Sequence, residues 1–447
     1  MPICRCFFWG RRAPPVRTAI ERLGARGSSA YAVGGCVRDS LIGRVPQDWD
    51  ITTSALPEEV EEVFSDCRLI ETGIKHGTVT VLFEGQSLEI TTYRLDGDYI
   101  DNRHPSSVTF SRSLEDDLAR RDFTVNAMAY HPERGIVDLY GGREDLAKKL
   151  VRAVGEPAKR FDEDGLRILR GLRFASSLGF AIEEKTAEAI REKKQLLQNI
   201  SPERIREEFC KLLVGVGARE ILLDYADVIA VFLPEIVPAI GFDQKSQYHC
   251  YDVYRHMVEA LAASKPDLLV RLSLYFHDIG KPSTFYEDER GGHFHDHGPQ
   301  GAEMVEQILK RLRFPNEIVA RVTNLVYRHD APIPATEKSV KRLMQKFSDE
   351  DIERLMEIKR CDRLAHAEGH REPVESLTAI PKLVRKIREE ESCFDLSGLA
   401  VKGDDLLALG IPAGPEVGTL LHELLEKVID GELPNDKAAL LTYLQKR

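Results

Sequence analysis

Long apolar runs are absent from this sequence of 447 residues, and none approaches the roughly 20 residues that a membrane-spanning helix needs. The eight cysteines are dispersed and include no Cys-x-x-Cys pair, which predicts a reduced, cytoplasmic protein without a disulfide framework. Positive charge is in deficit, since 62 Lys and Arg face 73 Asp and Glu. Any RNA contact must therefore use a local group of basic side chains. No membrane or DNA partner is expected.

The sequence changes character near Gly142. Before it, segments rich in β-branched and aromatic residues predict strands over 31–33, 50–53, 78–83 and 88–93, with a hairpin turn at Gly85-Gln86. After it, no further strands are expected and helical periodicity dominates. The predicted fold class is α+β, a small mixed or antiparallel sheet followed by all-helical domains. The expected parts are a disordered leader over 1–20, a head over 21–150, a helical neck over 151–240, a histidine-rich helical domain over 241–375 and a helical tail over 376–447.

A glycine turn followed by two carboxylates is the first candidate site. The glycines at 34–35 let the backbone approach a bulky anion, and Arg38 on the helix beyond can hold phosphate. On a strand, Asp48 and Asp50 would face one side and Trp49 the other. Two such carboxylates facing a phosphate pocket can bind the Mg²⁺ ions of an in-line phosphoryl or nucleotidyl transfer. The alternative is a glycine turn before a half-buried strand with an acidic face.

Two features further along the head could complete this site. Glu89, on a predicted strand, could join the metal ligands or take a proton from an attacking hydroxyl, or it could be a solvated strand residue. The segment from Arg94 to Pro105 is polar, is punctuated by Gly and Pro, and is too long for a hairpin connection. We interpret it as a mobile loop beside the site, with a plain surface loop as the alternative.

Adjacent charges at the start of an apolar helix form the next candidate. Arg121, Asp122 and Asn126 have the chemistry to contact ribose hydroxyls and a triphosphate, although a capped helix with surface charges fits equally well.

The neck contributes a row of arginines and a candidate base-reading pair. Arg167, Arg170 and Arg173 share one helical face without interleaved acids, which indicates an anion partner rather than a solvated amphipathic helix. Asp164 and Arg167 could together accept from the amino group of C or A and donate to the neighbouring ring acceptor. G and U would place a carbonyl oxygen against the carboxylate. Two side chains could thus select C and A without a template.

Histidines gather in the third region, where adjacent His-Asp with further His and Asp on other helices could hold a divalent metal ion. The candidate ligands are His256, His277, Asp278, His297, His329 and Asp362.

Together these motifs resemble those of the class II tRNA nucleotidyltransferase and bacterial poly(A) polymerase family, of the polymerase β superfamily. The resemblance rests on Gly34-Gly35-x-Val37-Arg38-Asp39, Asp48-x-Asp50, Thr72-Gly73-Ile74-x-His76-Gly77-Thr78, Arg120-Arg121-Asp122 and Glu163-Asp164-x-x-Arg167. The histidine-rich region resembles an HD phosphohydrolase domain. The segment from Gly403 to Gly418 resembles tRNA-contacting helices.

The resemblance implies sequential addition of C, C and A to the tRNA 3′ end from CTP and ATP, with release of pyrophosphate. Asp48 and Asp50 would hold Mg²⁺, and Glu89 is a candidate third carboxylate. The implied nucleotide contacts are Gly35 and Arg38 to the triphosphate, Arg121 and Asp122 to the ribose with Asn126 beside them, Asp164 and Arg167 to the base, and Arg170 and Arg173 to phosphate. His256, His277, Asp278 and Asp362 match the HD signature for a transition metal, with His297 and His329 as extra ligands.

Alternative functions stay open at this point. A loop complete from Arg94 to Pro105 favours full CCA addition or A addition over CC addition, and poly(A) polymerases form a second branch. A metal-dependent HD phosphohydrolase is a different class of enzyme, which would act on 2′,3′-cyclic or 2′-phosphates. A tRNA-binding protein with an inactive head is disfavoured by the intact carboxylates. The sequence does not set the oligomeric state.

Overall fold

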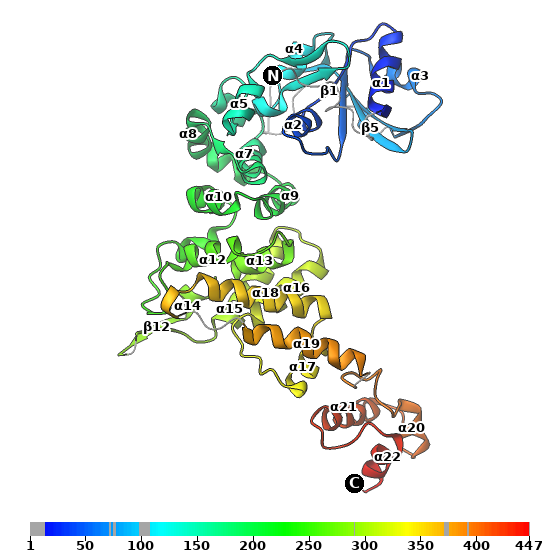
Figure 1. Ribbon diagram of the computed structural model, residues 1–447, viewed down its shortest axis with the longest axis vertical. Coiled ribbons are helices and arrows are strands. Elements are labelled where there is room, and N and C mark those ends of the chain that lie inside the picture. The colour runs from blue at the N-terminus through cyan, green and yellow to red at the C-terminus, as the bar shows by residue number, and fades with distance from the viewer. Residues whose placement is uncertain are drawn as a thin grey trace. The chain divides into compact units, whose positions relative to one another are not determined.

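The computed structural model describes residues 14–70, 73–74, 77–97, 108–289, 291–370, 375–390 and 393–446. They form two compact units, Met1–Pro234 and Glu235–Arg447 (Figure 1). The expected finer boundaries near 150 and 375 stay predictions. Thr72 and His76 of the quoted motif, and residues 98–105 of the expected mobile loop, lie outside the described residues.

A seven-stranded mixed sheet organises the first unit, with the strand order β3-β4-β5-β2-β1-β8-β9. Only β2 and β5 pair in parallel; the other neighbours are antiparallel. The strands are β1 (Ala30–Val33), β2 (Trp49–Thr53), β3 (Arg68–Ile70), β4 (Thr78–Phe83), β5 (Gln86–Thr92), β8 (Met128–His131) and β9 (Gly135–Asp138). The prediction of an α+β fold with a mixed sheet is confirmed.

The hairpin between β4 and β5 is one residue away from its predicted position. Phe83 pairs with Gln86, so the turn residues are Glu84 and Gly85, with φ of 47° and 78°. Two consecutive positive φ angles give the type I′ turn that matches the twist of paired strands. A separate two-stranded ribbon of β6 (Arg94–Asp96) and β7 (Val108–Phe110) follows.

The helix α1 (Pro14–Ala25) corrects the expectation of disorder up to residue 20. Val16, Ala19, Ile20 and Leu23 have the spacing of one helical face, and all four are buried in the core beneath the sheet. Burial of this apolar face fixes the helix to the head. Residues 1–13 lie outside the described part. The other head helices are α2 (Gly35–Leu41), α3 (Pro57–Val63), α4 (Leu114–Ala119), α5 (Gly142–Lys148) and the short η2 (Thr124–Asn126).

Helices dominate beyond Gly142, although short strands continue and correct the expectation that none would follow. β10 (Leu150–Val151) pairs in parallel with β11 (Ala181–Ile182). In the predicted helical neck, Asp164 and Gly165 separate α6 (Pro157–Glu163) from α7 (Leu166–Leu178). The remaining helices of this unit are α8 (Glu184–Lys193), η3 (Lys194–Asn199), α9 (Pro202–Leu213), α10 (Ala218–Asp224) and α11 (Ala226–Ile229), and η4 (Pro234–Ala239) follows at the boundary.

The second unit is helical apart from the hairpin of β12 (Phe285–Asp288) and β13 (Gly291–Phe294). Its helices are α12 (Val253–Ala262), α13 (Leu268–Phe276), α14 (Lys281–Thr284), α15 (His297–Arg311), α16 (Asn316–Arg328), α17 (Glu337–Met344), α18 (Asp349–Ala365), η5 (Glu368–His370), α19 (Glu375–Glu389), α20 (Gly403–Ala408), α21 (Pro415–Ile429) and α22 (Lys437–Gln445). The last three share a separate core of buried leucines. No described helix in either unit is long and apolar enough to cross a membrane.

Candidate functional site

Three acidic residues are neighbours at the interior strands β2 and β5 of the head sheet, and we call them the acidic cluster: Asp48, Asp50 and Glu89. Asp50 and Glu89 are register partners on the parallel strands β2 and β5, so their side chains project from the same face. Trp49 points the other way into the core, as predicted. Asp48 stands immediately before β2 and is exposed to solvent. The expected third carboxylate is therefore beside the pair.

The acidic cluster lacks enough positive charge to balance it. Burial raises the pKa of Asp50 to about 6, Glu89 and Asp48 add to the rise, and Arg121 alone opposes it. An oxygen-only donor set with unbalanced negative charge suits a hard divalent cation such as Mg²⁺. The residues present therefore fit the implied metal.

The glycine turn lies next to Arg121. Gly34 has a φ of 79°, and a Cβ at this position would lie 3.2 Å from the Arg121 Nη1 atom. Helix α2 begins directly after it at Gly35 and carries Arg38. Arg38 is buried and donates from Nη1 to the Asn126 Oδ1 atom at 2.6 Å. The turn, Arg38, Arg121 and Asn126 are thus brought together, as the sequence predicted.

Asp117, which sequence reasoning missed, holds the arginine pair in place. It accepts from Arg121 Nη2 at 3.0 Å, from Arg120 Nη2 at 2.7 Å and from Thr52 Oγ1 at 3.0 Å. Burial opposes its ionisation, but Arg121 and Arg120 outweigh burial and lower the pKa of Asp117. Its position, three and four residues before the arginines on α4, was the available signal.

Asp122 forms a buried ion pair with Arg170, and its contact to the ribose stays a prediction. Arg170 donates from Nη2 to the Asp122 Oδ2 atom at 2.6 Å, and the other carboxylate oxygen accepts from Asn126. Burial opposes ionisation of Asp122, but Arg170 outweighs it and holds the pKa of the carboxyl well below its usual range. Asp122 thereby ties the head to α7.

The arginine row has carboxylate partners that the sequence pattern did not reveal. Arg173 donates from Nε to the Glu208 Oε2 atom of α9 at 2.7 Å, and Arg170 Nη1 lies 3.7 Å from Glu208 Oε1. The Arg173 guanidinium also stacks 3.4 Å from the centre of the Phe174 ring. The helix itself carries no acids between these arginines, but Glu208, 35 residues from Arg173, gives them a carboxylate neighbour within the chain, and an external anion partner stays a prediction.

Asp164 and Arg167, the candidate base-reading pair, each form hydrogen bonds with residues outside the pair. Arg167 donates from Nη1 to the Glu163 Oε2 atom at 2.6 Å and from Nη2 to the Arg120 carbonyl at 3.1 Å. Asp164 accepts from Arg204 Nη2 at 3.0 Å and from the Leu166 backbone amide. Each side chain is fixed by a different partner, which is how a rigid recognition edge is built.

The six residues predicted in the second unit come together, and we call them the histidine cluster: His256, His277, Asp278, His297, His329 and Asp362. His256 Nε2 lies 2.9 Å from Asp362 Oδ1, and His277 Nε2 lies 3.3 Å from Asp278 Oδ2. On the other side of Asp278, Oδ1 lies 3.5 Å from both His297 Nε2 and His329 Nε2. The ligand atoms of the cluster fall into two neighbouring groups of three, His256, His277 and Asp362 in one and Asp278, His297 and His329 in the other.

The ring orientations in the histidine cluster fit a metal. The Nδ1 atoms of His277, His297 and His329 contact the backbone carbonyls three residues earlier, at 2.8, 2.7 and 2.6 Å. An Nδ1–H donated to a carbonyl fixes the tautomer and leaves Nε2 as the ligand atom. The Nε2 atom of His277 is buried and has no hydrogen-bond partner in the described part of the chain.

Internal charge balance distinguishes the histidine cluster. Lys281 Nζ lies 2.7 Å from Asp278 Oδ2. Burial opposes ionisation of both aspartates, but His277 and Lys281 near Asp278, and the histidine hydrogen bonds at Asp362, hold their pKa values well below the usual range. Burial alone would lower the pKa of His277, yet Asp278 and Asp362 raise it to about 10. A cavity of about 510 Å³ opens onto the cluster, and Lys245, His293 and His295 line its rim.

Three family models match the chain in order. The Poly A polymerase head domain matches residues 30–152, "Probable RNA and SrmB- binding site of polymerase A" matches 179–240, and tRNA nucleotidyltransferase domain 2 matches 299–444. The chain is 36% identical to the CCA-adding enzyme of Lactobacillus delbrueckii subsp. bulgaricus over 434 residues, covering 95% of this chain and 96% of the relative. The chain belongs to the CCA-adding enzyme family.

Other CCA-adding enzymes are similar to this chain over nearly its full length. The Enterococcus faecalis enzyme is 34% identical, covering 98% of this chain and 96% of the relative. The crystal structure of the Bacillus stearothermophilus CCA-adding enzyme in complex with CTP is 30% identical, with a TM-score of 0.72 and 98% of each chain covered. The Thermotoga maritima enzyme complexed with tRNA, at 21% identity, a TM-score of 0.60 and coverage of 99% of this chain and 98% of that one, supports the fold alone.

Proposed function

We propose that the chain adds C, C and A in sequence to the 3′ end of tRNA, from CTP and ATP, with release of pyrophosphate. The observation that carries the proposal is the acidic cluster beside Gly34 and Arg121, in a chain similar to CCA-adding enzymes over nearly its whole length. The similar enzyme bound to CTP supports the nucleotide class. Acidic residues on two strands and a glycine turn are by themselves compatible with many nucleotidyl transfers. Similarity to the CCA-adding enzyme family is what supports tRNA as the acceptor.

In this mechanism Asp48 and Asp50 hold the catalytic metal, and Glu89 completes the carboxylate set. When bound, Mg²⁺ supplies stabilisation of the negative charge that develops as pyrophosphate leaves. Asp50 must be ionised to act, and Arg121 favours that state. Asp117 keeps Arg121 directed toward the glycine turn.

The incoming nucleotide would lie between the glycine turn and the start of α7. Gly35 and Arg38 would contact the triphosphate, with Asn126 orienting the Arg38 guanidinium. Arg121 would reach the ribose or phosphate, and Asp122 would fix this edge through Arg170. Asp164 and Arg167 would read the base, since each is held by a partner outside the pair. Phosphate contact by Arg170 and Arg173 stays a prediction, because both already lie beside Glu208.

A direct test uses tRNA that lacks its terminal C, C and A, supplied with CTP, ATP and Mg²⁺. We expect elongation by all three nucleotides with wild-type protein. A tRNA that stays unextended would remove the proposal. The Arg191→Ala variant is a matched control for handling and stability, because Arg191 stacks on Tyr225 in the neck, away from the proposed contacts.

A second candidate activity is metal-dependent phosphohydrolysis in the second unit. The observation that favours it is the set of Nε2 atoms directed at Asp278 beside a cavity with a basic rim. Transition metals suit this mixed nitrogen and oxygen donor set. Hydrolysis of 2′,3′-cyclic CMP that persists in Asp48→Ala and vanishes in Asp278→Ala would establish it as a separate activity, and loss in both variants would refute the separation.

A further inference from the structure

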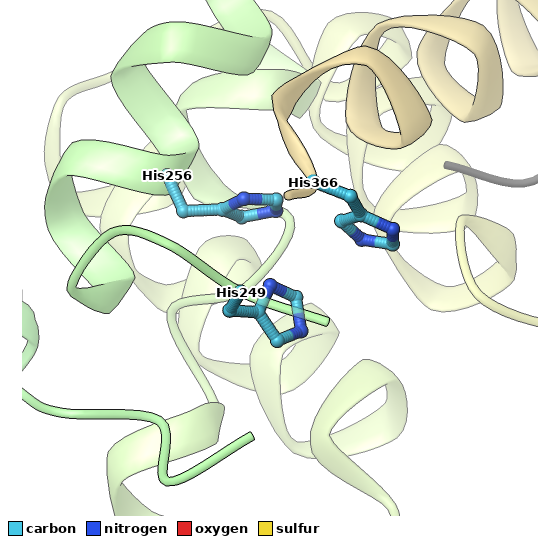
Figure 2. A group of neighbouring side chains, drawn as sticks. All are labelled: His249, His256 and His366. Carbon is cyan, nitrogen blue, oxygen red and sulfur yellow. The ribbon is translucent and has the colours of Figure 1, made fainter. Parts of the chain in front are cut away.

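Two histidines outside the predicted ligands stand at the end of the histidine cluster. His249 precedes α12 and His366 follows α18, and both line the cavity. Together with His256 of α12 they bring three imidazoles to one place, as Figure 2 shows. One ring nitrogen from each lies within 4.8 Å of the other two.

The His249 ring stands nearly perpendicular to the other two rings. The His249 ring stands at 86° to His256 and at 83° to His366, with centroids 5.0 and 4.8 Å apart. A perpendicular ring directs an edge, where the nitrogens are, toward its neighbours. His256 and His366 are stacked on each other, with centroids 5.5 Å apart and 25° between the ring planes, and His249 lies across this pair.

Unsatisfied nitrogens provide an independent sign of a missing ligand. His256 is fully buried, and its Nδ1 atom has no hydrogen-bond partner among the residues that the structure describes. The buried Nδ1 atom of His249 also has no hydrogen-bond partner among the described residues. A buried polar atom left without a partner is costly, and such atoms in native proteins call for an explanation. A bound cation at the shared point would supply one.

The donor set selects the kind of ion. Three imidazole nitrogens suit borderline metals such as Zn²⁺, Co²⁺ or Ni²⁺, whereas Mg²⁺ prefers oxygen. Metal–nitrogen bonds of about 2.1 Å require nitrogens about 3.4 Å apart in a tetrahedral site. The three nitrogens lie within 4.8 Å of one another, so metal binding would require the half-buried His249 and His366 to move closer to His256.

We propose that His249, His256 and His366 bind a transition-metal ion at a position separate from the rest of the histidine cluster. The remaining residues still offer two ligand sets without His256. One is His277, Asp278 and Asp362, since His277 Nε2 lies 3.3 Å from Asp278 and 3.5 Å from Asp362. The other is Asp278, His297 and His329. The second unit thus offers three neighbouring metal positions. Metal binding at the position of His249 does not depend on whether the protein has the CCA-adding or the hydrolytic activity.

The test is metal stoichiometry, measured on the full-length protein after metal removal and equilibration with Co²⁺. Elemental analysis should find one more Co²⁺ per chain in wild type than in the His249→Ala/His366→Ala variant. The matched control is His293→Ala/His295→Ala, which removes two histidines from the rim of the same cavity and should bind as many ions as wild type. Equal stoichiometry in wild type and in His249→Ala/His366→Ala would overturn the proposal.

A second variant guards against a folding defect. In His366→Cys, a thiolate bound to Co²⁺ should add a sulfur-to-metal charge-transfer band that wild type lacks. His366→Ala alone should weaken Co²⁺ binding at this position by more than the roughly 10- to 100-fold that loss of an outer-shell partner costs. Unchanged Co²⁺ spectra in His366→Cys, in protein with a wild-type thermal transition, would contradict ligation by this residue.

Discussion

The acidic cluster of the head and the histidine cluster of the second unit differ in how far neighbouring cations compensate the negative charge of their carboxylates. In the head, three carboxylates are gathered near one arginine, and the pKa of Asp50 rises to about 6, chiefly through burial. In the second unit, burial also opposes ionisation, but His277 and Lys281 outweigh it and lower the pKa of Asp278. The first arrangement needs an external cation, whereas the second is balanced before any ion binds.

The donor atoms differ as well. The acidic cluster offers oxygen only, which suits Mg²⁺, while the histidine cluster offers Nε2 atoms whose rings are fixed by backbone carbonyls, which suits transition metals. Under the proposed function, the two sites would therefore select different metal ions. The comparison predicts that each site can be disabled without the other.

The largest expected effect comes from removing the oxygen donors. Asp48→Ala/Asp50→Ala should lower the initial rate of CTP incorporation into tRNA by at least about 10³-fold, because metal charge stabilisation is worth several kcal/mol and each 1.36 kcal/mol is tenfold. Binding of tRNA and hydrolysis of 2′,3′-cyclic CMP should be unchanged. Extension at a wild-type rate would contradict the metal assignment.

The reciprocal change is in the second unit. Asp278→Ala should lower hydrolysis of 2′,3′-cyclic CMP by at least about 100-fold, more than loss of an outer-shell partner typically costs, since Asp278 lies beside His256 and His277 on one side and His297 and His329 on the other. The rate of CCA addition should stay within twofold of wild type, at roughly the noise of such assays. Loss of both activities in Asp278→Ala would contradict the independence of the two sites.

A smaller effect is expected for base selection. Arg167→Ala should reduce the preference for CTP over UTP by roughly 5- to 150-fold, because a good bidentate contact to a base is worth about 1–3 kcal/mol. Ratios of kcat/KM for the two nucleotides measure it, with Arg191→Ala as the control. Unchanged discrimination in Arg167→Ala would assign base selection elsewhere.

The smallest effect is a dependence on pH. Asp50 is protonated below about pH 6, and a cation needs its carboxylate form, so Mg²⁺ binding should weaken as the pH falls through 6. Between pH 7 and 5 the Mg²⁺ concentration for half-maximal extension should rise roughly tenfold. In Glu89→Gln the midpoint should move to lower pH, because Glu89 raises the pKa of Asp50. A midpoint that does not move would place Glu89 outside the acidic cluster.

Local patterns in the sequence predicted much of both sites. Alternation placed Asp50 on the opposite side of the strand from Trp49, and the six candidate ligands read from the sequence come together in the histidine cluster. What the sequence could not supply were partners set by tertiary packing, such as Glu208 for Arg173 and Arg204 for Asp164. The isolated positions of His249 and His366 carried no motif, and α1 was missed although its apolar spacing was readable.

The most direct test reads the ends that the wild-type protein makes on tRNA. The substrates are tRNA lacking all of the terminal C, C and A, lacking the last two, or lacking only the A, each supplied with all four nucleoside triphosphates and Mg²⁺. The head as described predicts that sequencing finds every product restored to C, C and A, with addition stopping there. Addition of A alone to the longest substrate, or tails of repeated A, would contradict the proposed function.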